Sequence, residues 1–76
     1  GYELPFDFSE SSSSLLFTVG KDNAGSYADI YLNNDYLESS RVTRKGQIKI
    51  PKRSPAGTKL MKHATSRDSI QIFIKN

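Results

Sequence analysis

The 76-residue chain contains no cysteine, no tryptophan and a single histidine. Without cysteine it has neither disulfides nor thiolate ligands, and one histidine does not supply the several Cys and His ligands of a structural zinc site. Small domains often depend on such cross-links, because a chain of this length buries only about 60% of its unfolded surface. We therefore expect one domain over residues 1–76, stabilised by apolar packing alone and holding no metal or cofactor.

Long hydrophobic runs and catalytic motifs are also missing. No apolar stretch approaches the roughly 20 residues of a membrane-spanning helix, so we expect no membrane insertion. The chain has no GxSxG motif and no glycine-rich phosphate loop. Its one histidine, His63, follows Lys62, which favours a packing role over that of a base or ligand. We therefore expect no catalytic residues and no enzymatic activity.

Basic residues are scarce in the first half of the chain and acidic residues in the second. Residues 1–40 contain seven acidic residues and one base, Lys21, whereas residues 41–76 contain ten bases and one acid, Asp68. The halves therefore carry about −6 and +9, although the net charge of the chain is only +3. Such polarity predicts either a basic surface for an anionic partner or two halves that attract each other as they pack.

Apolar and polar residues alternate along most of the chain, which is the pattern of strands with one buried face. The strand-like segments are 2–8, 15–19, 27–32, 36–43, 47–52, 58–65 and 70–75. Asn33-Asn34 and Gly46 are expected to form tight turns, and Pro55-Ala56-Gly57 a further turn before the strand at 58–65. The sequence therefore predicts an all-β domain, a small antiparallel sandwich of six to seven short strands. Residues 1–14 would form an edge strand, because of Pro5, and a serine-rich loop.

One face of these strands supplies the expected core. Its members are Leu15, Phe17, Val19, Ala28, Ile30, Leu32, Ile48, Ile50, Leu60, Ile70, Ile72 and Ile74. On the opposite face, Tyr27, Tyr31 and Phe73 point outward, where their rings are able to stack on sugars or bases. The alternative interpretation is structural, namely that these rings only cover a neighbouring loop.

A basic segment is the second candidate site. Its five cations are expected on a hairpin around Gly46 and on the loop that leaves it, and they are Arg44, Lys45, Lys49, Lys52 and Arg53. Each is able to neutralise one phosphate, so nucleic-acid binding through them would weaken steeply with salt.

The segment "VTRKGQIKIPK" resembles the opening strand of the swapped-hairpin transition-state regulators and antitoxins, the AbrB and MazE type. The later "PAGTKL" and "DSIQIFIK" follow in that family's order. This resemblance implies a dimeric, cytoplasmic DNA-binding domain whose basic residues face phosphates.

Residues 16–76 also resemble the immunoglobulin-like repeats of bacterial surface adhesins and phage virion proteins. The resemblance is carried by the order of four motifs, "YADIYLNNDYL", "KGQIKIP", "PAGTKL" and "SIQIFIK". It covers most of the chain, whereas the regulator pattern covers about half. It implies an immunoglobulin-like sandwich that is monomeric as an isolated domain.

The sequence thus favours a non-catalytic immunoglobulin-like module for display, adhesion or structural decoration on a bacterial surface or virion protein. Its expected partner is a protein or a surface glycan. Two alternatives stay open, namely the basic DNA-binding domain and a carbohydrate-binding module that uses the outward aromatic residues.

Overall fold

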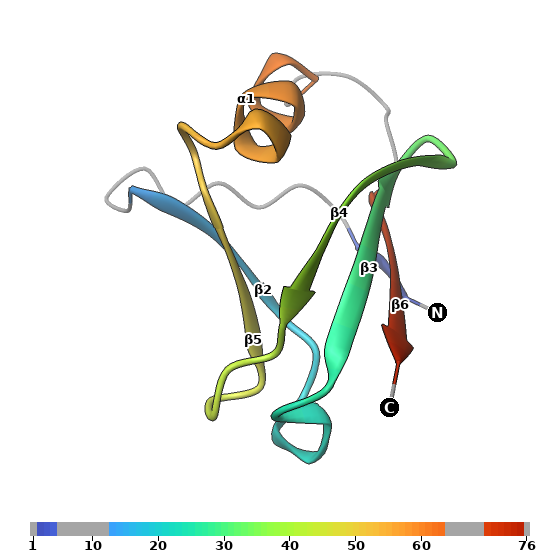
Figure 1. Ribbon diagram of the computed structural model, residues 1–76, viewed down its shortest axis with the longest axis vertical. Coiled ribbons are helices and arrows are strands. Elements are labelled where there is room, and N and C mark those ends of the chain that lie inside the picture. Colours follow the sequence, from blue (N-terminus) through green and yellow to red (C-terminus); the bar gives the residue numbers. More distant parts are fainter. Residues whose placement is uncertain (1, 5–12, 64–69, 76) are drawn as a thin grey trace.

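A computed structural model of the chain describes residues 2–4, 13–63 and 70–75. Its strands form two antiparallel sheets, one of four strands in the order β1-β6-β3-β4 and one of two strands, β2-β5 (Figure 1). The strands are β1 (Tyr2–Leu4), β2 (Ser14–Thr18), β3 (Tyr27–Leu32), β4 (Asp35–Arg41), β5 (Gln47–Pro51) and β6 (Ile70–Lys75). A short 3-10 helix, η1 (Lys21–Asn23), follows β2, and one α-helix, α1 (Pro55–Lys62), follows β5. The prediction of a mostly β fold with antiparallel pairing is confirmed.

The two sheets face each other and enclose the core between them (Figure 1). Eleven of the twelve core residues expected from the alternation are buried, and the twelfth, Ile74, is partly buried and packs against the others. Two further members, Val42 and Ala56, were not expected. Residues 2–4 form the expected edge strand, while the rest of the expected segment 2–8 lies outside the described residues.

The turn between β3 and β4 has the geometry that its sequence predicts. Asn33 and Asn34 have φ angles of 50° and 71°, the left-handed values of a two-residue hairpin turn, which asparagine tolerates. The backbone N–H of Asn34 also donates to the Gln71 side chain at 2.9 Å, which ties this turn to β6. The hairpin therefore sets the register of β3 and β4 at its closed end.

A bulge then changes that register. Tyr31 lies opposite Tyr36, but Ile30 lies opposite Glu38, so Leu37 has no partner in the ladder. Leu37 instead packs against the core. Because the extra residue reverses the alternation, Tyr36 and Ser39 lie on the same outer face although they are three positions apart.

The helix α1 corrects one prediction, since residues 55–57 were expected to be a turn and residues 58–65 a strand. The Ser54 side chain accepts a hydrogen bond from the Gly57 N–H at 3.0 Å and caps the helix, and Pro55 occupies its first turn. Ala56 and Leu60, one turn apart, bury the same side of the helix. Residues 64 and 65 of the expected strand lie outside the described residues. Among the described residues, no helix has the length and apolar character needed to cross a membrane.

Candidate functional site

Outward side chains of the three strands β6, β3 and β4 form a regular grid on the side of the four-stranded sheet that faces away from β2 and β5. The pairing places Gln71, Tyr31 and Tyr36 in one row, Phe73, Asp29 and Ser39 in the next, and Lys75, Tyr27 and Arg41 in the third. We call this surface the aromatic face, with the members Tyr27, Asp29, Tyr31, Tyr36, Ser39, Arg41, Gln71, Phe73 and Lys75. The structure therefore brings together the three aromatic residues expected from the sequence, Tyr27, Tyr31 and Phe73.

Aromatic rings pack against one another at the end of this face nearest the β3–β4 turn. Tyr31 lies between Tyr36 and Phe73, with ring centroids 5.6 and 5.3 Å away and interplanar angles of 73° and 86°. These edge-to-face contacts contribute about 0.5–1.5 kcal/mol each. The outer rings nevertheless stay open to solvent, since Tyr36 is 55% and Phe73 46% exposed. The result is a preorganised apolar platform.

A buried carboxylate lies at the centre of the aromatic face. Asp29 is only 8% exposed. It accepts a hydrogen bond from the Ser39 hydroxyl at 2.5 Å and pairs with the Lys75 ammonium at 3.0 Å. Because the Ser39 proton is committed to Asp29, the Tyr36 hydroxyl donates to Ser39 Oγ, at 2.8 Å. The carboxylate therefore links all three strands of the face.

These contacts shift two pKa values in opposite directions. The hydrogen bond from Ser39 and the ion pair with Lys75 lower the pKa of Asp29 below its ordinary 3.8. The same carboxylate raises the pKa of Lys75 above its ordinary 10.5. The network therefore stays charged across the whole range in which proteins are normally handled.

Thermal stability is expected to depend on this pair at both extremes of pH. The contribution of Asp29 is complete above 3.8 and is lost as the pH falls through its lower folded-state pKa. That of Lys75 is complete below 10.5 and is lost as the pH rises through its higher folded-state pKa. Circular dichroism melts of the wild type and Asp29→Asn should therefore show a constant Tm difference between these values, shrinking outside them. A difference that grows in acid would contradict the assignment.

The five expected basic residues do not form one cluster. The expected tight turn at Gly46 is present, since the Gly46 N–H donates to the Thr43 carbonyl at 2.9 Å. Residues 42–46 nevertheless connect β4 of one sheet to β5 of the other, so the expected pairing of the strands on either side of the turn is wrong. The chain crosses because Val42 enters the core and the Gly46 carbonyl accepts from the N–H groups of Val19 and Gly20, at 2.8 and 3.1 Å, beyond the end of β2.

Three of these cations gather at this crossover and two lie elsewhere. Arg44, Lys45 and Lys49 line one hollow, together with Thr43 and Gln47. Lys52 and Arg53 follow the other end of β5, a five-residue strand about 16 Å long, and line a second hollow before α1.

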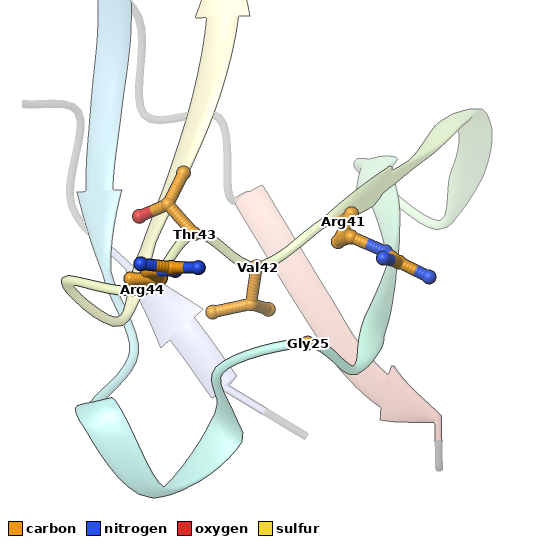
Figure 2. Close-up of a pocket in the computed structure, with 5 residues that line it drawn as sticks. All are labelled: Gly25, Arg41, Val42, Thr43 and Arg44. Carbon is orange, nitrogen blue, oxygen red and sulfur yellow. The ribbon is translucent and has the colours of Figure 1, made fainter.

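A neighbouring pocket connects the crossover to the aromatic face. Gly25, Arg41, Val42, Thr43 and Arg44 line it, and the two arginine side chains lie on either side of Val42 (Figure 2). Arg41 also belongs to the aromatic face, where its guanidinium carbon lies 5.2 Å from the Tyr27 ring centroid. Aromatic and cationic side chains that are separate in the sequence are thus continuous in space.

The sequence pattern identified three of the nine members of the aromatic face and missed the other six, among them Tyr36 and Arg41. The position of Tyr36 follows from the Asn33-Asn34 turn, because a two-residue hairpin places residue 36 opposite Tyr31. No comparable signal exists for Arg41, since only the bulge brings it, rather than Ser40, opposite Tyr27.

Within residues 2–4, 13–63 and 70–75, no three acidic or histidine side chains gather in a way that could hold a metal ion. Comparisons with protein-family models, with curated proteins and with solved structures gave no match. The interpretation of the site therefore rests on its own geometry.

Proposed function

We propose that this chain is a non-catalytic immunoglobulin-like module that mediates adhesion at a bacterial surface or virion by binding a glycan on its aromatic face. In this proposal the six strands constitute a small sandwich, and the four-stranded sheet carries the ligand. The observation that supports it most directly is the platform of Tyr31, Tyr36 and Phe73 on a solvent-facing sheet surface. Large exposed apolar groups of this kind mark interaction surfaces.

Two properties of the face favour a glycan over an apolar protein surface. Pyranose rings have apolar faces that pack on aromatic rings, and their hydroxyl groups need polar neighbours. Gln71 lies in the same row as Tyr31 and Tyr36 and supplies an amide group beside their rings. Aromatic groups with nearby polar groups are the usual composition of small-ligand sites.

The test is binding of a panel of polysaccharides followed by tyrosine fluorescence, since the chain has four tyrosines and no tryptophan. We expect the double variant Tyr36→Ala/Phe73→Ala to lose about 2 kcal/mol or more of binding, roughly a 30-fold loss of affinity, as for aromatic hot spots. The matched control is Met61→Ala on α1. It also removes an exposed apolar side chain, and it should bind the polysaccharide as tightly as the wild type does.

Two results would contradict the proposal. One is an equal loss of binding in Met61→Ala and in the double variant. The other is tight binding of a short DNA duplex that depends on Arg44, Lys45 and Lys49, which would favour the DNA-binding alternative. That alternative has some support, because these three cations share a hollow.

A further inference from the structure

The cationic end of the aromatic face differs chemically from its aromatic end. Tyr27 has Lys75 on one side and Arg41 on the other, each directly opposite it in the strand pairing. Arg44 follows on the far side of Val42 (Figure 2). Three cations therefore lie along one edge of a surface whose other end is apolar.

The two arginines differ from Lys75 in their partners. Lys75 pairs with Asp29, whereas neither Arg41 nor Arg44 has a carboxylate partner among the described residues. Among the described residues, Arg41 contacts the Tyr27 ring and has no hydrogen-bonded carboxylate, an arrangement that leaves its N–H groups able to donate. A guanidinium group has donors in a planar fork that matches a carboxylate, and it binds such groups more strongly than neutral ones.

The pocket lined by Arg41 and Arg44 has few polar groups besides the two arginine side chains. Its backbone groups are already paired, since the Gly25 N–H donates to the Val42 carbonyl at 3.0 Å and the Val42 N–H to the Ser26 carbonyl at 2.8 Å. Nothing lies within 4 Å of the position that a Cβ would take at Gly25, so this wall is open. A charged ligand at the pocket would therefore be held by the arginine side chains, which lie on its two sides (Figure 2).

The distribution of charge limits what kind of anion fits. The two rows at the aromatic end hold no cation, since Gln71, Tyr31 and Tyr36 form the first row and Phe73, Asp29 and Ser39 the second. A nucleic-acid strand, with a phosphate on every residue, would bring negative charge to this end as well. A glycan with neutral sugars and an occasional acidic one would place its apolar rings on the platform and its anionic group at the arginines.

We propose that Arg41 and Arg44 bind the anionic group of an acidic glycan whose neighbouring sugar rings pack on the aromatic face. This inference rests on the proposed function and extends it by naming the ligand class. The shared chemistry is an exocyclic carboxylate or sulfate on a sugar ring.

The probe is a largely methyl-esterified oligogalacturonate that keeps an occasional free carboxylate, compared with its fully methyl-esterified form, which has the same sugar rings without the charge. Titration calorimetry at low ionic strength should show that the wild type binds the acid about tenfold more tightly than the ester. Arg41→Gln and Arg44→Gln should each lose most of this preference, and Arg44→Gln, which lies outside the aromatic face, should keep its affinity for the ester. Lys59→Gln, which removes an exposed cation on α1, should behave as the wild type. Added salt should reduce the preference.

The outcomes separate this inference from the proposed function. If Tyr36→Ala/Phe73→Ala abolishes binding while both arginine variants keep the full preference, the glycan-binding function stands and the arginine site is refuted. If the wild type binds neither form, both are refuted. Equal losses in Lys59→Gln and the arginine variants would indicate nonspecific attraction and overturn the site, as would tighter binding of oligothymidylate than of the glycan. A sulfated dextran that binds better than the oligogalacturonate, with the same arginine dependence, supports the site and identifies sulfate as its ligand.

Discussion

Ile72→Asp is expected to unfold the domain. Ile72 is fully buried at the inner face of the four-stranded sheet, where it pairs with Ile30 of β3 and with β1 on the other side. A carboxylate there would lie among the apolar residues of the core and cost several kcal/mol, while a domain of this size has a total stability of only about 5 kcal/mol. The far-UV circular dichroism spectrum and the dispersion of amide proton signals should both change to those of an unfolded chain.

Phe73→Asp is the matched control, because it places the same carboxylate one residue further along β6 on the solvent-facing side. It removes the ring contact with Tyr31 and should cost about 1 kcal/mol, which leaves the domain folded. A folded Ile72→Asp protein with an unchanged Tm would show that β6 does not bury this residue.

Gly57→Ala is expected to destabilise the domain by about 1–3 kcal/mol, although alanine is the better helix former by about 1 kcal/mol. A Cβ on Gly57 would collide with the carbonyl oxygen of Pro51 and approach two backbone atoms of Lys52 to 2.9 Å. Backbone atoms cannot rotate away, so α1 would have to move off the end of β5. Urea unfolding followed by circular dichroism measures the change.

The control variant Thr58→Ala measures the effect of helix propensity on stability without the backbone collision. Thr58 is exposed on the same helix, so its replacement should stabilise the domain by a few tenths of a kcal/mol. A stabilised Gly57→Ala protein would therefore contradict the packing of α1.

The buried faces of the strands were predictable because they depend on a local property. Side chains alternate across a strand, so Ile48 and Ile50, or Ile70 and Ile72, identify an inner face whatever the partner strand is. The Asn33-Asn34 turn is local in the same way. Val42 was missed because it lies between two elements, where no alternation applies, and Ala56 because its segment was taken for a turn.

The helix was missed although its signals are present. Ser54 and Pro55 form a typical helix start, and Ala56 and Leu60 have helical spacing. The segment has only eight residues, too few for a period to stand out, and Thr58, Leu60 and Lys62 fit an alternating pattern nearly as well. The helix forms because Gly57 allows its first turn to lie against the backbone of Pro51 and Lys52.

The candidate site was predictable in part. Alternation alone placed Tyr27, Tyr31 and Phe73 on an outer face, but it did not show that they share one sheet surface, because strand order is a long-range property. The basic residues show the opposite case, since Arg44 and Lys52 are close in sequence and lie at opposite ends of an extended strand. Closeness along the chain does not gather side chains when the chain between them is a strand.

By itself, the sequence determined the mostly β character, nearly all of the core and the tight turn after β3, because each depends on the conformational preferences of a few neighbouring residues. Only the tertiary structure decided that β5 pairs with β2, that α1 closes one end of the core, and that Arg41 lies beside Tyr27. These features depend on which apolar faces cover one another and on a bulge that lets Leu37 reach the core. The bulge shifts every later residue of β4 by one position, and so places an arginine beside the tyrosine on the aromatic face.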